Sequence, residues 1–517
     1  MSECNCGYYP AVVIPGIGQS KTALYSADGK MLKTAWPVDI DGKKLLKALS
    51  FQAFKTVMTG DDSKLLKKLK ELVAQEVSAL KVNSEGVPNP FLKPVDYDRK
   101  PLSLCSEDDK RYIYKMVPMK DVAEIIGEDR LFFFAYNSFG QPYETAKALD
   151  SYIQNVKRLT GSDKVNLVPV SLGGSVATAY FDAYKERDDI HRVCYFVPAV
   201  NGSSIVSDIF LNNLDLSEPF SLFEILLGKK DAKMLEKLSE HLPKGELERV
   251  ASVLIEAVFE NIIVNCPAMW AILPREKYEE AAEKYLCGYG KGTLKAKTER
   301  YFRAQKKYEE ILLEQEKKGV EFFSICGYGR ELLPFVKSKK VNSDSVVDFS
   351  SASLGGTAAP CGEKLNERAD LKRNCNDLSH NHVSPDGTAD VSTSLFPERV
   401  FCFKNQQHDD TAYNDVAMAV AKRILTDESF KDVYSDARFP QFNGSRNTGK
   451  IAYKLLPEAY ELLKLDLHES VRKELEEAVK AAQDIFGDTI IENGEKADNV
   501  VLRLESAIIA AKPDLRK

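Results

Sequence analysis

The sequence predicts an α/β fold built on a mostly parallel sheet with helices on both faces. Short runs of β-branched and aromatic residues recur along the chain, and segments with helical spacing of apolar residues separate them. Strands that are apolar throughout, rather than alternating, are typical of parallel sheets buried on both sides. The expected strands are 12–14, 131–136, 165–170, 193–197, 320–325 and 399–403, and the clearest helices are 143–159 and 415–425.

The composition of the 517-residue chain excludes several classes of protein. With 71 Lys and Arg against 77 Asp and Glu, the net charge of −6 argues against a nucleic-acid binder. The sequence has no run of about 18 or more apolar residues, so no transmembrane segment is expected. The N-terminus shows no signal-peptide pattern. We therefore expect a cytoplasmic protein from the chain as given, and a cell-surface or secreted one if the chain lacks its signal.

Two helical regions interrupt the alternation of strands and helices and define the expected domains. Residues 205–318 are strongly helical, with expected helices that include 233–241, 246–264 and 297–318, and they lie between two expected strands. This predicts a helical cap or lid inserted into a core formed by residues 1–204 and 319–430. Residues 446–517 contain three helical patterns, which predict a small C-terminal bundle. This bundle resembles the three-helix FIVAR-type modules of bacterial surface proteins, and a helical appendage packed on the core is the alternative.

The strongest functional signal is a serine between an expected strand and an expected helix. Ser171 follows the strand 165–170 and is followed by Leu172, two glycines and a helical pattern. Strand, tight turn with serine, then helix is the context of the nucleophile elbow of α/β-hydrolases. Pro169 replaces the first glycine of the usual Gly-x-Ser-x-Gly pattern, which is tolerable where the strand end needs no N–H. A second Ser-Leu-Gly-Gly at 353–356 leads into a loop, so we predict an ordinary turn there.

A nucleophilic serine needs a histidine base and a carboxylate that orients the base. Of the six histidines, His408 lies just past the expected strand 399–403 and before a helix, where an α/β-hydrolase places its base. Asp386 lies upstream of that strand, so the order Ser171, Asp386, His408 is that of the hydrolase fold. Asp390 is the alternative acid, because sequence alone does not decide which carboxylate points inward.

The loop after the first strand supplies the expected oxyanion donors. It contains Gly16 and Gly18, which let the backbone turn its amides toward the serine. We expect the amides of Ile17 or Gly18 to act together with that of Leu172. The third glycine of a dinucleotide-binding motif is absent, and we predict no cofactor.

Two groups of residues offer metal ligands, but neither predicts a site. Cys4 and Cys6 lack the spacing of the usual zinc motifs. His380 and His382 would share one face of a strand, and Asp386 follows them. A metal site needs three or four converging ligands, and no third histidine lies near in the sequence, so we predict no metal site.

Several of these runs together resemble the lecithin:cholesterol acyltransferase-like lipases, a family of α/β-hydrolases. The resemblance covers about residues 10–425 in order, and the residue before Ser171 departs from it by being Val rather than His. The family's Pro-Tyr-Asp-Trp-Arg run corresponds only to 134–140. The resemblance implies acyl chemistry and rests on 13–18, the segment around Trp36, the elbow 169–174, and the runs 196–203, 267–274 and 386–389.

We therefore predict a serine acyl hydrolase of lipase or esterase type that forms an acyl-enzyme from a small-molecule or lipid ester. One alternative is acyl transfer to an alcohol by the same triad, and another is a non-catalytic binding or surface protein on a hydrolase scaffold. The apolar runs 210–214, 220–227 and 253–264 could line an acyl-chain site or contact a membrane surface. An ordinary packed lid would show the same apolar stripes.

Overall fold

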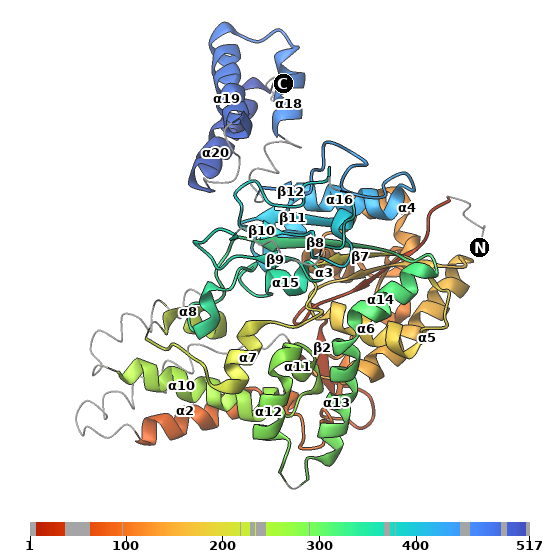
Figure 1. Ribbon diagram of the computed structural model, residues 1–517, viewed down its shortest axis with the longest axis vertical. Helices are drawn as coiled ribbons and strands as arrows, with labels where there is room; N and C mark the ends of the chain where they lie inside the picture. The colour runs from red at the N-terminus through yellow and green to blue at the C-terminus, as the bar shows by residue number, and fades with distance from the viewer. Residues whose placement is uncertain are drawn as a thin grey trace.

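The predicted parallel sheet forms the centre of the molecule (Figure 1). The computed structural model describes residues 7–36, 63–95, 97–217, 219–227, 233, 245–288, 290–366, 373–377, 379–444, 455–487 and 494–512. Seven strands lie in the order β12-β11-β8-β7-β6-β1-β5, and every neighbouring pair is parallel. The strands are β1 (Ala11–Ile14), β5 (Leu131–Phe133), β6 (Val165–Pro169), β7 (Ile190–Phe196), β8 (Glu321–Tyr328), β11 (Val400–Lys404) and β12 (Phe442–Asn443). The α/β prediction is confirmed, and β12 is an edge strand that we did not predict.

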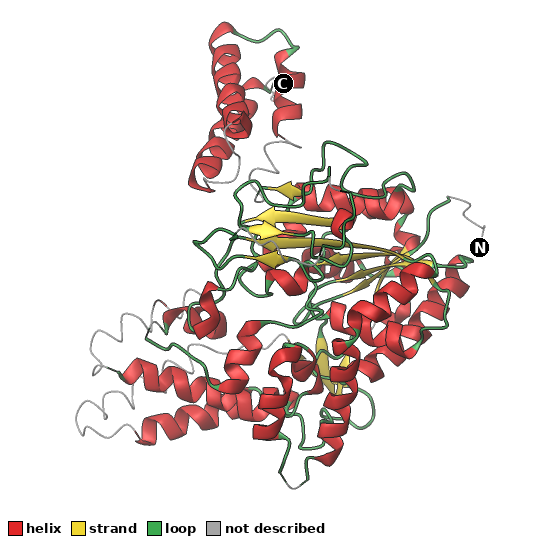
Figure 2. Ribbon diagram, viewed as in Figure 1, coloured by secondary structure: helices red, strands yellow, loops and turns green. Residues whose placement is uncertain are grey.

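Helices cover both faces of this sheet (Figure 2). The strand β1 illustrates why the central strands are apolar at every position. Val12 and Ile14 pack in the hydrophobic cluster that contains α5 (Pro142–Thr160) and α6 (Gly173–Ala183). Ala11 and Val13 point to the opposite face, into the cluster that contains the buried side chains of α3, α4 and α16. Successive side chains of a strand alternate between faces, so a sheet covered on both sides needs apolar residues at every position. The helices on this opposite face are α3 (Glu107–Met116), α4 (Lys120–Ile126) and α16 (Asp415–Thr426).

A long helical region lies between β7 and β8. Its predicted helix over 246–264 is α-helical to Val258 and then continues as a π-helical segment over Phe259–Ile263. The predicted helix over 297–318 is two helices that meet at Lys307. The predicted helix over 233–241 lies outside the described residues apart from Lys233. The helices are α7 (Ser204–Leu211), α8 (Phe220–Leu227), α10 (Glu246–Val258), α11 (Pro267–Ala271), α12 (Tyr278–Tyr285), α13 (Gly292–Lys306) and α14 (Tyr308–Lys317).

The three helices near the C-terminus have a hydrophobic core of their own. Leu456, Leu475 and Leu504 belong to a cluster whose residues all lie within 455–511. Figure 1 shows the three helices packed together at the top of the view. The role of this bundle and the role of the region between β7 and β8 as a cap remain predictions. No described helix combines the length and the apolar character needed to cross a bilayer. The three helices are α18 (Leu456–Leu463), α19 (Glu469–Gly487) and α20 (Gly494–Ala511).

Smaller elements surround the main sheet, and the sequence analysis did not predict them. An antiparallel three-stranded sheet has the order β3-β2-β4, and β9 pairs with β10 in a two-stranded ladder. The strand β3 has four exposed residues, so it lacks the apolar run by which the central strands were found. These strands are β2 (Thr22–Tyr25), β3 (Met31–Trp36), β4 (Leu92–Pro94), β9 (Thr357–Ala358) and β10 (Ala389–Asp390). The sequence does predict a helix over 63–82, and the helix α2 spans Ser63–Glu76.

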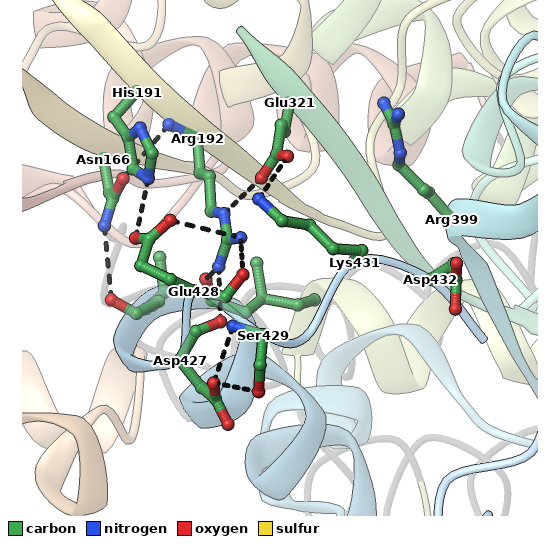
Figure 3. Close-up of polar contacts among 12 residues, drawn as sticks. Asn166, His191, Arg192, Glu321, Arg399, Asp427, Glu428, Ser429, Lys431 and Asp432 are labelled. Carbon is green, nitrogen blue, oxygen red and sulfur yellow. Dashed lines mark hydrogen bonds and ion pairs between the residues drawn. The ribbon is translucent and has the colours of Figure 1, made fainter. Parts of the chain in front are cut away.

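A buried arginine joins the amino-terminal ends of β7 and β8 to the end of α16 (Figure 3). The side chain of Arg192 is fully buried, and its Nε donates to Glu321 Oε2 at 2.6 Å. Its Nη1 donates to the carbonyls of Ile424 and Asp427, both at 2.8 Å. The other oxygen of Glu321 pairs with Lys431 Nζ at 2.7 Å. This network lies at the opposite end of the sheet from the carboxyl ends of the strands.

We expect Arg192→Ala to lower the free energy of unfolding by about 3–5 kcal/mol, because it leaves buried acceptors without their charged partner. Lys431→Ala is the matched control, since it removes the half-exposed partner of the same carboxylate. Its expected cost is at most about 1 kcal/mol. Urea unfolding followed by circular dichroism measures both values. Equal losses in the two variants would contradict a structural role for the buried guanidinium.

Candidate active site

Ser171 occupies the turn between β6 and α6 in a strained backbone conformation. Its φ of +51° is in the left-handed region, which residues with a Cβ rarely adopt. Two nearby positions must be glycine because a Cβ would not fit there. A Cβ on Gly173 would lie 2.3 Å from the carbonyl oxygen of Ile14, and a Cβ on Gly16 would lie 2.9 Å from Ser171 Cβ. The loop after β1 therefore passes directly against the serine.

Pro169 lies at a point of β6 where its missing N–H is tolerated. β6 pairs with β7 at Leu167 and Val193, and the next pairing between these segments is a single bridge between Val170 and Phe196. Pro169 lies between these two pairs. The departure from the usual glycine is therefore compatible with the sheet.

The imidazole of His408 lies between the serine and a buried aspartate. Its Nε2 is 3.0 Å from Ser171 Oγ, and its Nδ1 is 2.7 Å from Asp344 Oδ2. An ionised carboxylate only accepts hydrogen bonds, so the proton is assigned to Nδ1, and Nε2 can accept from the serine hydroxyl. Burial lowers the pKa of His408, but the charge and hydrogen bond of Asp344 outweigh burial and raise this pKa above its usual value.

Asp344 is fixed by the loop that follows β8. Its side chain is fully buried, and its Oδ1 accepts from the N–H groups of Val346 at 3.0 Å and Val347 at 2.7 Å. The backbone N–H of His408 donates to the carbonyl of Asp344 at 2.9 Å. Gly327 on β8 allows this approach, since a Cβ there would lie 2.8 Å from Asp344 Cβ. Two loops are thus held together at the carboxyl ends of β8 and β11.

The structure places Asp344 where the sequence analysis expected Asp386. Asp386 instead pairs with Lys404 Nζ at 2.7 Å, and this contact and nearby hydroxyls lower its pKa although burial raises it. The alternative acid, Asp390, is buried, and its Oδ1 accepts from the N–H of Ser392 at 2.8 Å. The carboxylate that contacts His408 belongs to the loop after β8, which is the neighbour of β11 in the sheet. It does not come from the segment that directly precedes β11 in the sequence.

The sequence did contain a signal for Asp344. It follows the expected strand 320–325 and keeps the order serine, aspartate, histidine. Asp386 keeps the same order, so chain order does not distinguish the two. The adjacency of β8 and β11 does distinguish them, and it is a tertiary property.

The loop that carries the predicted oxyanion donors Ile17 and Gly18 passes against the serine at Gly16, whose own N–H is occupied. The N–H of Gly16 donates to Gln19 Oε1 at 2.6 Å. Gly18 has a φ of +84° and packs toward the Trp36 ring. Among the hydrogen bonds of the described residues, none uses the N–H of Ile17, Gly18 or Leu172. The three predicted donors are therefore not occupied by other groups of the described chain.

Comparisons with known proteins assign this chain to no family. No family model and no curated protein matches it. Among solved structures, one similar chain belongs to the Tle4-Tli4 complex, with 13% identity over 80% of this chain and 97% of that chain and a TM-score of 0.33. Another is a lipase-esterase related protein from Clostridium acetobutylicum, with 12% identity over 39% of this chain and 87% of that chain and a TM-score of 0.16. Because both TM-scores are below 0.5, neither likeness supports a conclusion about this chain.

Proposed function

We propose that the protein is a serine acyl hydrolase with an α/β-hydrolase core, which cleaves a carboxylic ester through an acyl-enzyme on Ser171. The observation that carries this proposal is the hydrogen-bonded line from Ser171 Oγ through His408 to Asp344, with contacts of 3.0 and 2.7 Å. The three residues follow β6, β11 and β8, so they meet at the carboxyl ends of parallel strands. This edge is where open α/β sheets place their ligands.

The proposed mechanism uses each contact in turn. His408 Nε2 removes the hydroxyl proton as Ser171 Oγ attacks the ester carbonyl, and His408 then donates this proton to the leaving alcohol. Asp344 holds the imidazole and stabilises its cation. The amide of Leu172 and that of Ile17 or Gly18 bind the oxyanion, each contributing about 2.7–4 kcal/mol by analogy with measured donors. Water then attacks the acyl-enzyme, with His408 again as the base.

We propose that the helices between β7 and β8 form a cap above this site. Support comes from contacts between α7 and the loop that carries Asp344. The N–H and Oγ of Ser204 donate to the two oxygens of Asp348 at 3.0 and 2.6 Å. Ser203 Oγ donates to the carbonyl of Val346 at 2.5 Å. The first helix of the region is thus tied directly to the loop of the acid.

Hydrolysis of p-nitrophenyl esters with short and long acyl chains tests the proposed function. We expect turnover, with a preference among chain lengths that reports the shape of the capped site. Adding a primary alcohol separates hydrolysis from acyl transfer, because a transferase would form the new ester at the expense of the acid. A folded protein that turns over none of the esters and is not modified by a fluorophosphonate would contradict the proposal.

The value of kcat/KM should fall at acid pH as His408 becomes protonated. Protonated His408 cannot accept the serine proton, and its raised pKa means that protonation begins at a higher pH than for an ordinary histidine. We therefore expect the acid limb of the pH profile to have its midpoint above about 6.5. A midpoint well below that value would show that Asp344 does not stabilise the imidazolium.

A further inference from the structure

Four potential metal ligands converge beside the start of β11, whereas His408 follows the other end of this strand. Cys375, His380, His382 and Glu398 each offer one ligand atom, and these atoms all lie within 4.8 Å of one another. Cys375 Sγ is 3.6 Å from His380 Nδ1 and 3.6 Å from Glu398 Oε1. His380 Nδ1 is 2.9 Å from Glu398 Oε1. We propose that these residues form a structural site for a divalent transition-metal ion, with Zn²⁺ as the best match.

The three separations among the ligand atoms of Cys375, His380 and Glu398 fit a tetrahedral ion. Zinc–ligand bonds of about 2.0–2.3 Å place neighbouring ligand atoms of a tetrahedron roughly 3.3–3.6 Å apart. The two sulfur separations already have this value, and the nitrogen–oxygen pair needs to open by only a few tenths of an ångström. Thiolate, imidazole and carboxylate together suit Zn²⁺ better than Ca²⁺ or Mg²⁺, which prefer oxygen ligands.

The strongest evidence for a ligand is the free nitrogen of His382. Its side chain is only 3% exposed, and its Nδ1 is 2.8 Å from Gln441 Oε1. Gln441 Nε2 donates to the carbonyls of Pro397 at 2.6 Å and Val400 at 3.2 Å, which fixes the amide and leaves Oε1 as the acceptor. The proton therefore lies on His382 Nδ1, and Nε2 carries a lone pair.

That lone pair has no hydrogen-bond partner among the described residues, although Nε2 is buried. An unpaired buried polar atom is costly, and a metal ion would satisfy it. A second ring nitrogen held by an amide or a carbonyl is the usual arrangement of a metal-ligating histidine. The donor set and the unpaired buried nitrogen are two separate observations, and both favour a bound metal ion.

The proposed ion would pin a long loop to the edge of the sheet. Cys375, His380 and His382 lie in the segment between β9 and β10, whereas Glu398 lies in the turn before β11 and Gln441 directly precedes β12. Four protein ligands leave no open position, which is typical of structural rather than catalytic zinc. Cys375 and Glu398 also line an open pocket of about 520 Å³, through which an ion can enter.

The sequence analysis considered His380 and His382 with Asp386 and predicted no metal site. Asp386 pairs with Lys404 instead, and the remaining ligands lie on either side of the histidine pair in the sequence. The irregular spacing of the four ligands matches no zinc motif, so only the fold brings them together.

Cobalt titration of the chelator-treated full-length protein tests the proposal. We expect one Co²⁺ per chain, with the intense visible bands of tetrahedral Co²⁺ and a thiolate-to-cobalt charge-transfer band, both removed by Zn²⁺. Cys375→Ser should abolish the charge-transfer band and weaken binding at least about tenfold. Cys287→Ser, at an exposed cysteine outside the cluster, should change neither.

Two further variants show whether the N-terminal cysteines or the serine site contribute to the cobalt spectrum. A variant with Cys4→Ser and Cys6→Ser should keep the charge-transfer band, since the N-terminal cysteines are not ligands in this proposal. Ser171→Ala should also keep it, so the metal site and the proposed catalytic function can fail separately. Zinc should raise the melting temperature of the wild-type protein and leave that of Cys375→Ser unchanged.

The spectrum of the wild-type protein still tests the proposed thiolate ligand if Cys375→Ser does not fold. Absence of a thiolate band with stoichiometric Co²⁺ would overturn the proposal. Wild-type affinity in a folded Cys375→Ser protein would overturn it equally.

Discussion

Asp344→Asn should lower kcat for ester hydrolysis by about 10⁴-fold, the loss found when the triad aspartate of a serine protease is changed to asparagine. An asparagine amide in this position favours the wrong imidazole tautomer and removes the charge that stabilises the imidazolium. The fold around it should survive, because the backbone contact from His408 to residue 344 and the N–H donors of Val346 and Val347 remain. Steady-state kinetics on the preferred ester, with folded protein quantified by circular dichroism, gives the ratio.

Asp386→Asn is the matched control, since it makes the same chemical change at the carboxylate that the sequence analysis preferred. Asp386 pairs with Lys404, so we expect this variant to lose some stability and to keep kcat within a small factor of the wild-type value. If Asp386→Asn proved the more damaging of the two for kcat, the assignment of Asp344 as the acid would be wrong.

Ser171→Ala and His408→Ala should each lower kcat by about 10⁶-fold, and the double variant should lose almost nothing more. In the proposed mechanism the nucleophile and the base act as one unit, because the serine is reactive only while His408 Nε2 accepts its proton across 3.0 Å. Whatever activity remains would come from the oxyanion donors and from substrate binding. Kinetics of the two single variants and the double variant form a double-mutant cycle for this pair.

The double-mutant cycle also distinguishes an enzyme from a non-catalytic protein that only binds its ligand. Additive losses would mean that the two side chains act independently, which is incompatible with proton transfer between them. For a non-catalytic binding protein, neither substitution would change a slow background rate of hydrolysis.

The sequence predicted the sheet and the serine turn well because both depend on local properties. A strand buried on both faces must be apolar at each position, as β1 is, and such runs are visible in the sequence. The turn at Ser171 needs small residues where Gly16 and Gly173 approach neighbouring backbone and side-chain atoms. His408 could be found because it follows an apolar strand.

Asp344 and the proposed metal ligands escaped prediction because their contacts depend on which segments become neighbours in space. Asp344 reaches His408 because β8 lies beside β11, and Gly327 leaves room for the two loops to meet. The ligands around His382 come together by the return of a long loop to the sheet edge. Chain order and residue spacing alone do not identify either contact.

The most direct test of the central claim is to identify the residue that a fluorophosphonate modifies. The probe should attach one phosphonyl group per chain, and peptide mass spectrometry should locate it on Ser171. His408→Ala should slow this labelling strongly although Ser171 is intact, because the serine has then lost its base. Labelling of another residue in the folded wild-type protein, or equal labelling rates in the wild-type protein and His408→Ala, would contradict the account.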